Sequence, residues 1–199
     1  MPNLTFDFTW YRDLKGYHLV PAKVPKRRPG QSLLDFKPRD FQPARIVRNG
    51  GSLQSYRPLE AFNDLFRRFI EMDRSEGGVL KFVQAFGPLT HDGLRAKGDH
   101  VPALIRQAED MLWPGTMALN KLNAWIVTEH NETRLKVSPA CLLDALWLQL
   151  AQANTRSKEC PQCGNRFLVG VTVGKRKDAE FCSTKCQVQS KSLKRSRHA

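Results

Sequence analysis

The sequence predicts an α+β fold in which a mostly helical middle domain lies between an N-terminal β-hairpin and a small cysteine-rich module. Three observations predict this class. Apolar residues alternate with polar ones near the N-terminus, they recur at three-four spacing through the middle, and four of the five cysteines fall between residues 160 and 186. Because 199 residues suffice for one ordinary domain plus an appended module, we expect boundaries at 1–57, 58–155 and 156–199.

The N-terminal hairpin is predicted from the alternating apolar residues between Leu4 and Trp10. Residues 12–16 offer a turn, and residues 17–20 offer a returning strand. From there to residue 57 the chain carries several prolines and the basic triplet at residues 26–28. Prolines interrupt both sheet ladders and helices, so we expect an extended, Pro-rich basic wrap.

The middle domain shows apolar stripes at helical spacing over residues 59–70, 79–86 and 101–112, and these predict helices. We expect a break at Gly77-Gly78, a stop at Gly87-Pro88 and a loop over residues 91–100. A short fourth helix is predicted through Ala118, Leu122 and Trp125, followed by a hairpin over residues 126–137.

The last helix of this domain is predicted to begin at Ser138-Pro139, a capping hydroxyl followed by a proline in the first helical position. Its apolar stripe continues to Ala153. Cys141 falls inside this expected helix, where a free thiol packs as a small hydrophobic group.

The remaining cysteines form two short pairs, Cys160-x2-Cys163 and Cys182-x3-Cys186, separated by 18 residues. A structural zinc ion takes four thiolates at tetrahedral corners, about 2.3 Å away, and two such pairs supply them without a large core. We therefore expect one structural Zn²⁺ ion; four thiolates leave no open coordination position for catalysis. A redox pair or another metal is a less favoured alternative, because the sequence shows no strand before Cys160 of the kind that precedes a redox motif.

The residues between and after the two pairs predict how the module folds. Alternation from Phe167 to residue 173, followed by polar residues 174–178, predicts a hairpin that returns to Phe181. Ser183 can cap a helix that contains Cys186 in its first turn and continues through residues 187–197.

This plan of a turn-borne pair, a hairpin and a pair that opens a helix resembles a treble-clef zinc finger. The string Cys163-Gly164-Asn165-Arg166 is also similar to the signature of bacterial CGNR-type zinc fingers. Here it ends the first cysteine pair, whereas in that family it ends the second. The resemblance is confined to residues 156–199, and it implies a role in transcriptional regulation.

Charge is concentrated at the two ends of the chain. The net charge of +13 divides into +7 for residues 1–58, −2 for residues 59–154 and +8 for residues 155–199. Basic ends attract polyanions through counterion release, although they also serve solubility alone. The candidate nucleic-acid contacts are the basic residues of the C-terminal module: Arg166, Lys175, Arg176, Lys177, Lys185, Lys191, Lys194, Arg195 and Arg197.

These observations favour a zinc-dependent nucleic-acid-binding protein, with DNA preferred to RNA, of the bacterial DNA-binding transcriptional regulator type. The alternative is a protein-interaction adaptor with a purely structural finger. In either case the helical domain offers a surface for a protein partner or for self-association. We expect no enzyme, because His91-Asp92 and Asp99-His100 lie in an expected loop without a catalytic partner motif. The sequence contains no run of about 18 apolar residues and no apolar signal core, so we expect a cytoplasmic protein without a membrane partner.

Overall fold

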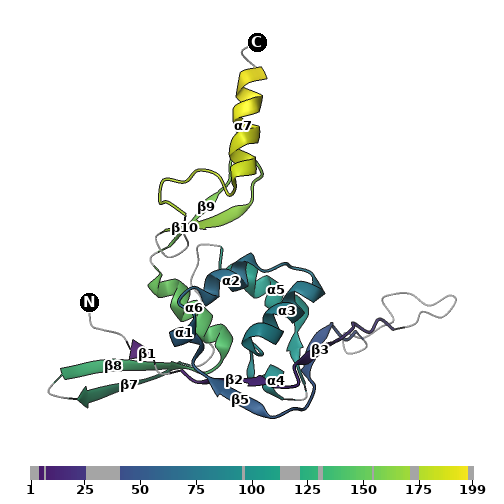
Figure 1. Cartoon of the computed structure of the whole chain (residues 1–199), viewed down its shortest axis with the longest axis vertical. Coiled ribbons are helices and arrows are strands. Elements are labelled where there is room, and N and C mark those ends of the chain that lie inside the picture. The colour runs from purple at the N-terminus through teal and green to yellow at the C-terminus, as the bar shows by residue number, and fades with distance from the viewer. Residues whose placement is uncertain are drawn as a thin grey trace.

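The computed structural model describes residues 5–6, 8–25, 41–95, 97–112, 122–129, 132–153, 155–170 and 175–196. Helices and small sheets are mixed in an arrangement compatible with the α+β class (Figure 1). We call the described residues up to 153 the body, and the described residues from 155 onward the cysteine module. Among the described residues, no helix has the length and apolarity that crossing a membrane would require.

The N-terminal strands form a long ribbon with residues 45–56, which the sequence predicted to be part of an extended, Pro-rich wrap. β2 (Trp10–Asp13) pairs antiparallel with β5 (Leu53–Tyr56), and β3 (Tyr17–Val20) pairs antiparallel with β4 (Arg45–Arg48). The predicted hairpin, in which the strand before the turn at residues 12–16 pairs with residues 17–20, is therefore wrong, because β2 and β3 pair with different strands. The reason lies in the turn, which bends the ribbon without reversing it: the N–H of Leu14 donates to the carbonyl of Ser52, and the N–H of Asn49 donates to the carbonyl of Gly16.

The bend in this ribbon is organised around the buried carboxylate of Asp13, which is 5% exposed. It accepts hydrogen bonds from the backbone N–H groups of Lys15 and Gly51. It also forms an ion pair with Arg48, whose Nε lies 3.0 Å from the carboxylate. A Cβ atom at Gly51 would collide with that carboxylate, so the turn requires glycine there. Burial raises the pKa of Asp13, but these hydrogen bonds outweigh it and lower the pKa below its ordinary value.

The helices of the body follow the apolar stripes with two changes. Their bounds are α1 (Pro58–Ala61), α2 (Leu65–Glu71), α3 (Glu76–Phe86), α4 (His91–Leu94), α5 (Val101–Asp110) and α6 (Leu142–Gln152). Gly77 and Gly78 lie inside the first turn of α3, because Ser75 caps that helix by accepting from the N–H of Gly78. Residues 91–100 contain α4 and β6 (Asp99–His100), whereas the sequence predicted a loop. The predicted stop at Gly87 is confirmed, with φ at 81°.

A second sheet joins the N-terminus to the end of the middle region, in the order β1-β8-β7. Its strands are β1 (Thr5–Phe6), β7 (Leu122–Glu129) and β8 (Glu132–Pro139), with β1 parallel to β8. The predicted hairpin over residues 126–137 is confirmed and is longer than expected. Leu122 and Trp125 lie on β7, so the fourth helix is wrong at those residues, while Ala118 lies outside the described residues.

The start of α6 also differs from the prediction. β8 runs through Pro139, so the helix begins at Leu142 and Cys141 is its N-cap. Cys141 is 7% exposed, and its thiol donates to the buried carboxylate of Asp144. Burial raises the pKa of Cys141 to about 12, which keeps it a neutral packed thiol, as the sequence indicated.

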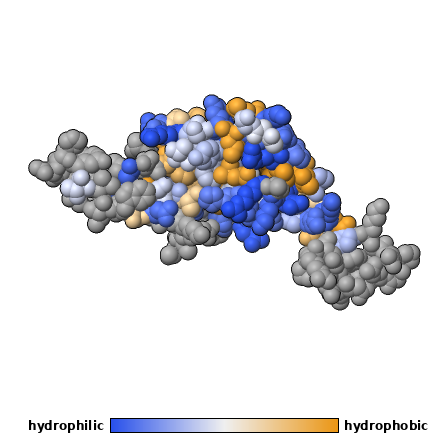
Figure 2. All heavy atoms as spheres, turned by 90° about the horizontal axis from the view of Figure 1, so that it is seen from below, coloured by the Kyte–Doolittle hydropathy of each residue, from blue (hydrophilic) through white to orange (hydrophobic). Residues whose placement is uncertain are grey.

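One hydrophobic core unites the ribbon and the helices of the body. Trp10 and Ile46 from the ribbon are buried in the same cluster as Phe66, Val83 and Leu146 from the helices. Polar side chains cover much of the face in Figure 2, with apolar residues between them. The body therefore has one continuous apolar core.

Candidate metal centre

The first cysteine pair lies in the turn of a short hairpin. β9 (Arg156–Glu159) pairs antiparallel with β10 (Arg166–Val169), and Cys160 and Cys163 lie between them. The N–H of Cys160 donates to the carbonyl of Asn165 at 3.0 Å, and the N–H of Gly164 donates to the carbonyl of Cys160 at 2.8 Å. Gly164 has φ at 71°, the left-handed conformation that glycine adopts without strain.

This hairpin corrects two sequence expectations. A strand does precede Cys160, and residues 166–169 pair with it and not with the segment that leads to Phe181. The chain still turns back where predicted, since Gly170 forms an antiparallel bridge with Lys175. Residues 171–174 lie outside the described residues. The strand before Cys160 has no βαβ setting around it, because β9 and β10 form a two-stranded antiparallel sheet.

The second cysteine pair opens the last helix, as the sequence predicted. Cys182 lies just before α7 (Thr184–Ser196), and Cys186 lies in its first turn. The hydroxyl of Ser183 accepts a hydrogen bond from the N–H of Cys186 at 3.3 Å, which is the predicted cap. The helix start thus fixes the direction in which both thiols of this pair point.

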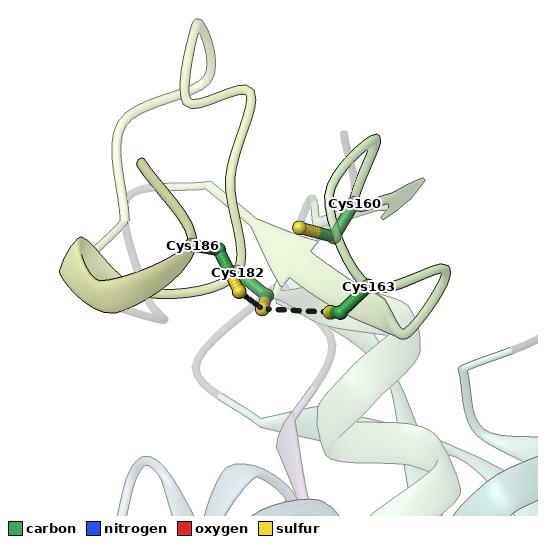
Figure 3. Close-up of side chains that lie close together, drawn as sticks. All are labelled: Cys160, Cys163, Cys182 and Cys186. Atoms are coloured by element: carbon green, nitrogen blue, oxygen red, sulfur yellow. Dashed lines mark hydrogen bonds between the residues drawn. The ribbon is translucent and has the colours of Figure 1, made fainter. Parts of the chain in front are cut away.

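The four thiols converge in space (Figure 3). All four Sγ atoms lie within 4.8 Å of one another, and the Sγ atom of Cys182 lies 3.5 Å from those of both Cys163 and Cys186. Four sulfurs at tetrahedral corners about 2.3 Å from one ion are about 3.8 Å apart, so the observed spacing fits a single metal ion. Cys160 and Cys186 are buried, Cys182 is half-buried and Cys163 is exposed.

Only a few side chains pack around this cluster. Phe167 and Val169 are buried with Cys160 and Cys186, and Ala179 and Phe181 pack against them. Lysines add hydrogen bonds: Lys158 Nζ donates to the carbonyl of Lys177 at 2.8 Å, and Lys175 Nζ donates to the carbonyl of Cys182. The ammonium of Lys175 also lies 5.0 Å from the centre of the Phe167 ring, a cation–π distance.

The thiols differ in acidity for physical reasons. Burial raises the pKa of Cys160, but hydrogen bonds from the backbone N–H groups of Cys182 and of the turn outweigh it and lower the pKa to about 6. Burial, followed by contacts with the neighbouring sulfurs, raises the pKa of Cys182 to about 12. One thiolate is therefore favoured in the absence of a cation. A divalent ion lowers the pKa of the remaining thiols by direct coordination.

The arrangement can hold a metal ion, and its chemistry is structural. Four cysteine ligands complete a tetrahedral shell, so a bound ion has no position left for water or substrate. Within the part of the chain that the structure describes, this is the one group of three or more His, Cys, Asp or Glu side chains with that spacing.

One member of each of the pairs His91-Asp92 and Asp99-His100 has contacts in the body, whereas Asp92 and His100 are exposed. The His91 ring lies against Trp10 at 5.6 Å between ring centres. The buried carboxylate of Asp99 accepts from the N–H groups of Leu89 and Thr90 and from the Thr90 hydroxyl. Burial raises the pKa of Asp99, and its three donors satisfy it inside the body.

The predicted nucleic-acid contacts occupy different environments. Arg166 and Lys175 are half-buried, whereas Arg176, Lys177, Lys185 and Lys191 are exposed. Lys194 and Arg195 belong to the last turns of α7, and Arg197 lies outside the described residues. The contacts of Lys175 inside the module give it a structural role that its position in a basic triplet did not indicate.

A cleft of about 620 Å³ separates the cysteine module from the body. Arg67, Arg74 and Glu109 line its body side, and Arg166 and Lys175 line its module side. No pattern in the sequence indicates this cleft, because charged residues on the exposed face of a helix are ordinary. The parts are in contact beside it, since the Ser157 hydroxyl donates to the carbonyl of Leu112 and Leu168 packs in the body core.

Comparison with known proteins found no matching family model, no matching curated protein and no matching solved structure.

Proposed function

We propose that Cys160, Cys163, Cys182 and Cys186 bind one structural Zn²⁺ ion in a treble-clef-like finger. The support is the convergence of four thiols from a hairpin turn and a helix start, at distances that fit a tetrahedral site. Thiolate ligands in tetrahedral geometry suit zinc, whereas magnesium and calcium prefer oxygen ligands. In this proposal the ion fixes the start of α7 against the β9–β10 hairpin.

We further propose that the zinc-held helix α7 binds nucleic acid, and that the protein is a DNA-binding transcriptional regulator. The observation that carries this proposal is that α7 projects away from the body (Figure 1). From Thr184 to Ser192, every side chain but those of Cys186 and the half-buried Ser190 is exposed. An isolated helix of this length is marginal in water, so a partner that covers it would supply the missing stabilisation.

Charge supports nucleic acid as that partner. The α7 sequence contains three lysines and one arginine and no acidic residue. Residues 155–199 carry +8, and a zinc ion with four thiolates adds −2, so the module remains strongly basic. Phosphate contacts by such a surface release counterions and give binding that weakens steeply with salt.

The shape of α7 favours DNA over RNA. The major groove of B-form DNA is about 12 Å wide and admits an α-helix. The major groove of A-form RNA is too deep and narrow for side chains to read. A single projecting helix therefore suits duplex DNA better than duplex RNA.

The test is the binding of the zinc-loaded full chain to duplex DNA as a function of salt. We expect the logarithm of the affinity to fall with the logarithm of salt, with a slope of about −0.9 for each phosphate contacted. Replacing Lys185 and Lys191 together with glutamate is expected to weaken binding by at least tenfold and to reduce that slope. The charge-matched control is the replacement of Lys15 and Lys23, exposed on the ribbon, which is expected to change the affinity much less. Equal losses in both double variants, or no binding at about 50 mM salt, would contradict the proposal and favour the adaptor alternative.

A further inference from the structure

The side of α7 that faces the metal and the side that faces solvent are set by the position of Cys186. At 100° per residue, Val188 and Arg195 fall opposite Cys186, and Lys191 and Ser192 fall beside them. We call Val188, Lys191, Ser192 and the position of Arg195 the outer face of α7. Val188, Lys191 and Ser192 are all exposed. Gln187 and Gln189 lie at the two borders of this face and are exposed as well.

Val188 is the unusual member of the outer face. It is 59% exposed, and among the side chains of the cysteine module whose exposure the structure describes it is the one large apolar side chain that is exposed. A β-branched residue has a low helix propensity, so helix stability does not explain a valine at this exposed position. Its position places an apolar contact in the middle of a basic face that carries no acidic residue.

We propose that the outer face of α7 enters the major groove of duplex DNA, and that Val188 contacts the C5-methyl group of a thymine. This inference rests on the proposed function and goes further by naming the base. Thymine is the base that presents a methyl group in the major groove, and apolar side chains contact it. Lys191 lies beside Val188 on the same helix face and is in place for a neighbouring phosphate.

The glutamines at the borders of the outer face agree with a site that contains A·T pairs. A glutamine side chain can form a two-point hydrogen bond with N6 and N7 of adenine in the major groove. Gln187 and Gln189 lie on either side of Val188, so one of them can reach a base pair adjacent to the thymine. The ligand of the outer face is therefore duplex DNA with at least one thymine that is read through its methyl group.

The test compares thymine with deoxyuridine, which lacks the methyl group and pairs identically. The zinc-loaded full chain first selects its preferred duplex from a random-sequence pool, and each thymine of that duplex is then replaced singly. At one or two positions we expect the wild-type affinity to fall about fourfold, the worth of one buried methyl-sized group. In Val188→Ala the same replacement is expected to have little effect, while Ser192→Ala, on the same face, keeps the wild-type response.

Each outcome bears on the inference separately from the proposed function. One outcome is that the wild type binds duplex DNA with the expected salt dependence while thymine-to-deoxyuridine replacement lowers the affinity of the wild type and of Val188→Ala equally. In that case Val188 does not read the methyl group, and the proposed function stands. A preference for RNA or for a protein ligand on the same face, without duplex DNA binding, overturns both. Retention of bound zinc and helical circular dichroism in Val188→Ala shows that the variant is folded.

Discussion

The body and the cysteine module are stabilised in different ways. The body buries a continuous cluster that includes Phe66, Leu65, Leu142 and Leu146, all fully inaccessible to solvent. The buried cluster of the module consists of two apolar side chains and two of the cysteines. Modules of about 40 residues or fewer generally need a metal or disulfides, because they cannot bury enough apolar surface. The same chain therefore uses hydrophobic burial in one part and four thiols in the other.

The largest expected effect is that of metal removal. Structural zinc sites of this type contribute about 10 kcal/mol or more to the folding of their module. A chelator is therefore expected to abolish the amide hydrogen-exchange protection of β10 while that of α3 and α6 persists. Hydrogen exchange read by mass spectrometry measures both regions in one sample. Joint loss of protection in β10 and α3, or no change in either, would contradict the claim that the metal stabilises the module and not the body.

A smaller effect, confined to the body, is expected from Phe66→Ala. Phe66 is completely buried, and truncating such a residue costs about 3–5 kcal/mol of unfolding free energy through lost burial and the cavity left behind. Denaturant unfolding measures this loss, and the amount of bound metal is expected to remain that of the wild type. The control is Leu14→Ala, at a side chain that is 65% exposed, where the change is expected to stay below about 0.5 kcal/mol.

Asp13→Asn is expected to have a smaller effect than Phe66→Ala. It should lower the free energy of unfolding by about 1–3 kcal/mol near neutral pH, because it removes the charge that pairs with Arg48 inside the bend. The lowered pKa of Asp13 means that its carboxylate stabilises the folded state above the ordinary value of 3.8 and ceases to do so as the pH falls through the folded value. Unfolding measured from neutral to acidic pH should therefore show the wild type and the variant converging below about pH 4. A difference that stays constant with pH would contradict this role. Asp178→Asn, at an exposed position of the module, serves as the control.

The smallest effect is expected from Lys175→Met, a change inside the cysteine module. Methionine keeps the apolar stem but loses the hydrogen bond to the carbonyl of Cys182 and the cation above Phe167. Together these are worth about 1 kcal/mol, so the metal affinity is expected to fall about fivefold. Competition with a chromophoric chelator measures this affinity. Lys177→Met, at an exposed side chain two residues away, is expected to leave it unchanged.

Patterns local in the sequence were good predictors of this molecule. The spacing of the two cysteine pairs predicted a four-thiol cluster, because each pair lies in a turn or at a helix start that its own residues determine. The helical stripes ending at Phe86 and Leu112 and the cap at Ser183 were predicted on the same local grounds.

Pairings between distant segments were not predictable from local patterns. The strands at residues 10–13 and 17–20 look like a hairpin, yet they pair with residues 45–56, because the bend at Asp13 is set by Arg48 and Gly51 far along the chain. Leu122 and Trp125 satisfy helical spacing, yet both lie on β7, which pairs with β8 in a three-stranded sheet. Lys175 looked like a surface cation, and its contact with Cys182 depends on how the two halves of the module meet.

The most direct test of the central claim is the metal content of the purified full chain and of its five single Cys→Ser variants. We expect one zinc ion per chain in the wild type, with tetrathiolate charge-transfer absorption after cobalt substitution. We expect zinc binding to be lost or much weakened in the variants at Cys160, Cys163, Cys182 and Cys186. Cys141→Ser, at the buried thiol of the body, should keep the full complement. A wild-type chain without bound metal, or one that loses it equally in Cys141→Ser, would contradict the claim that these four thiols hold a single ion.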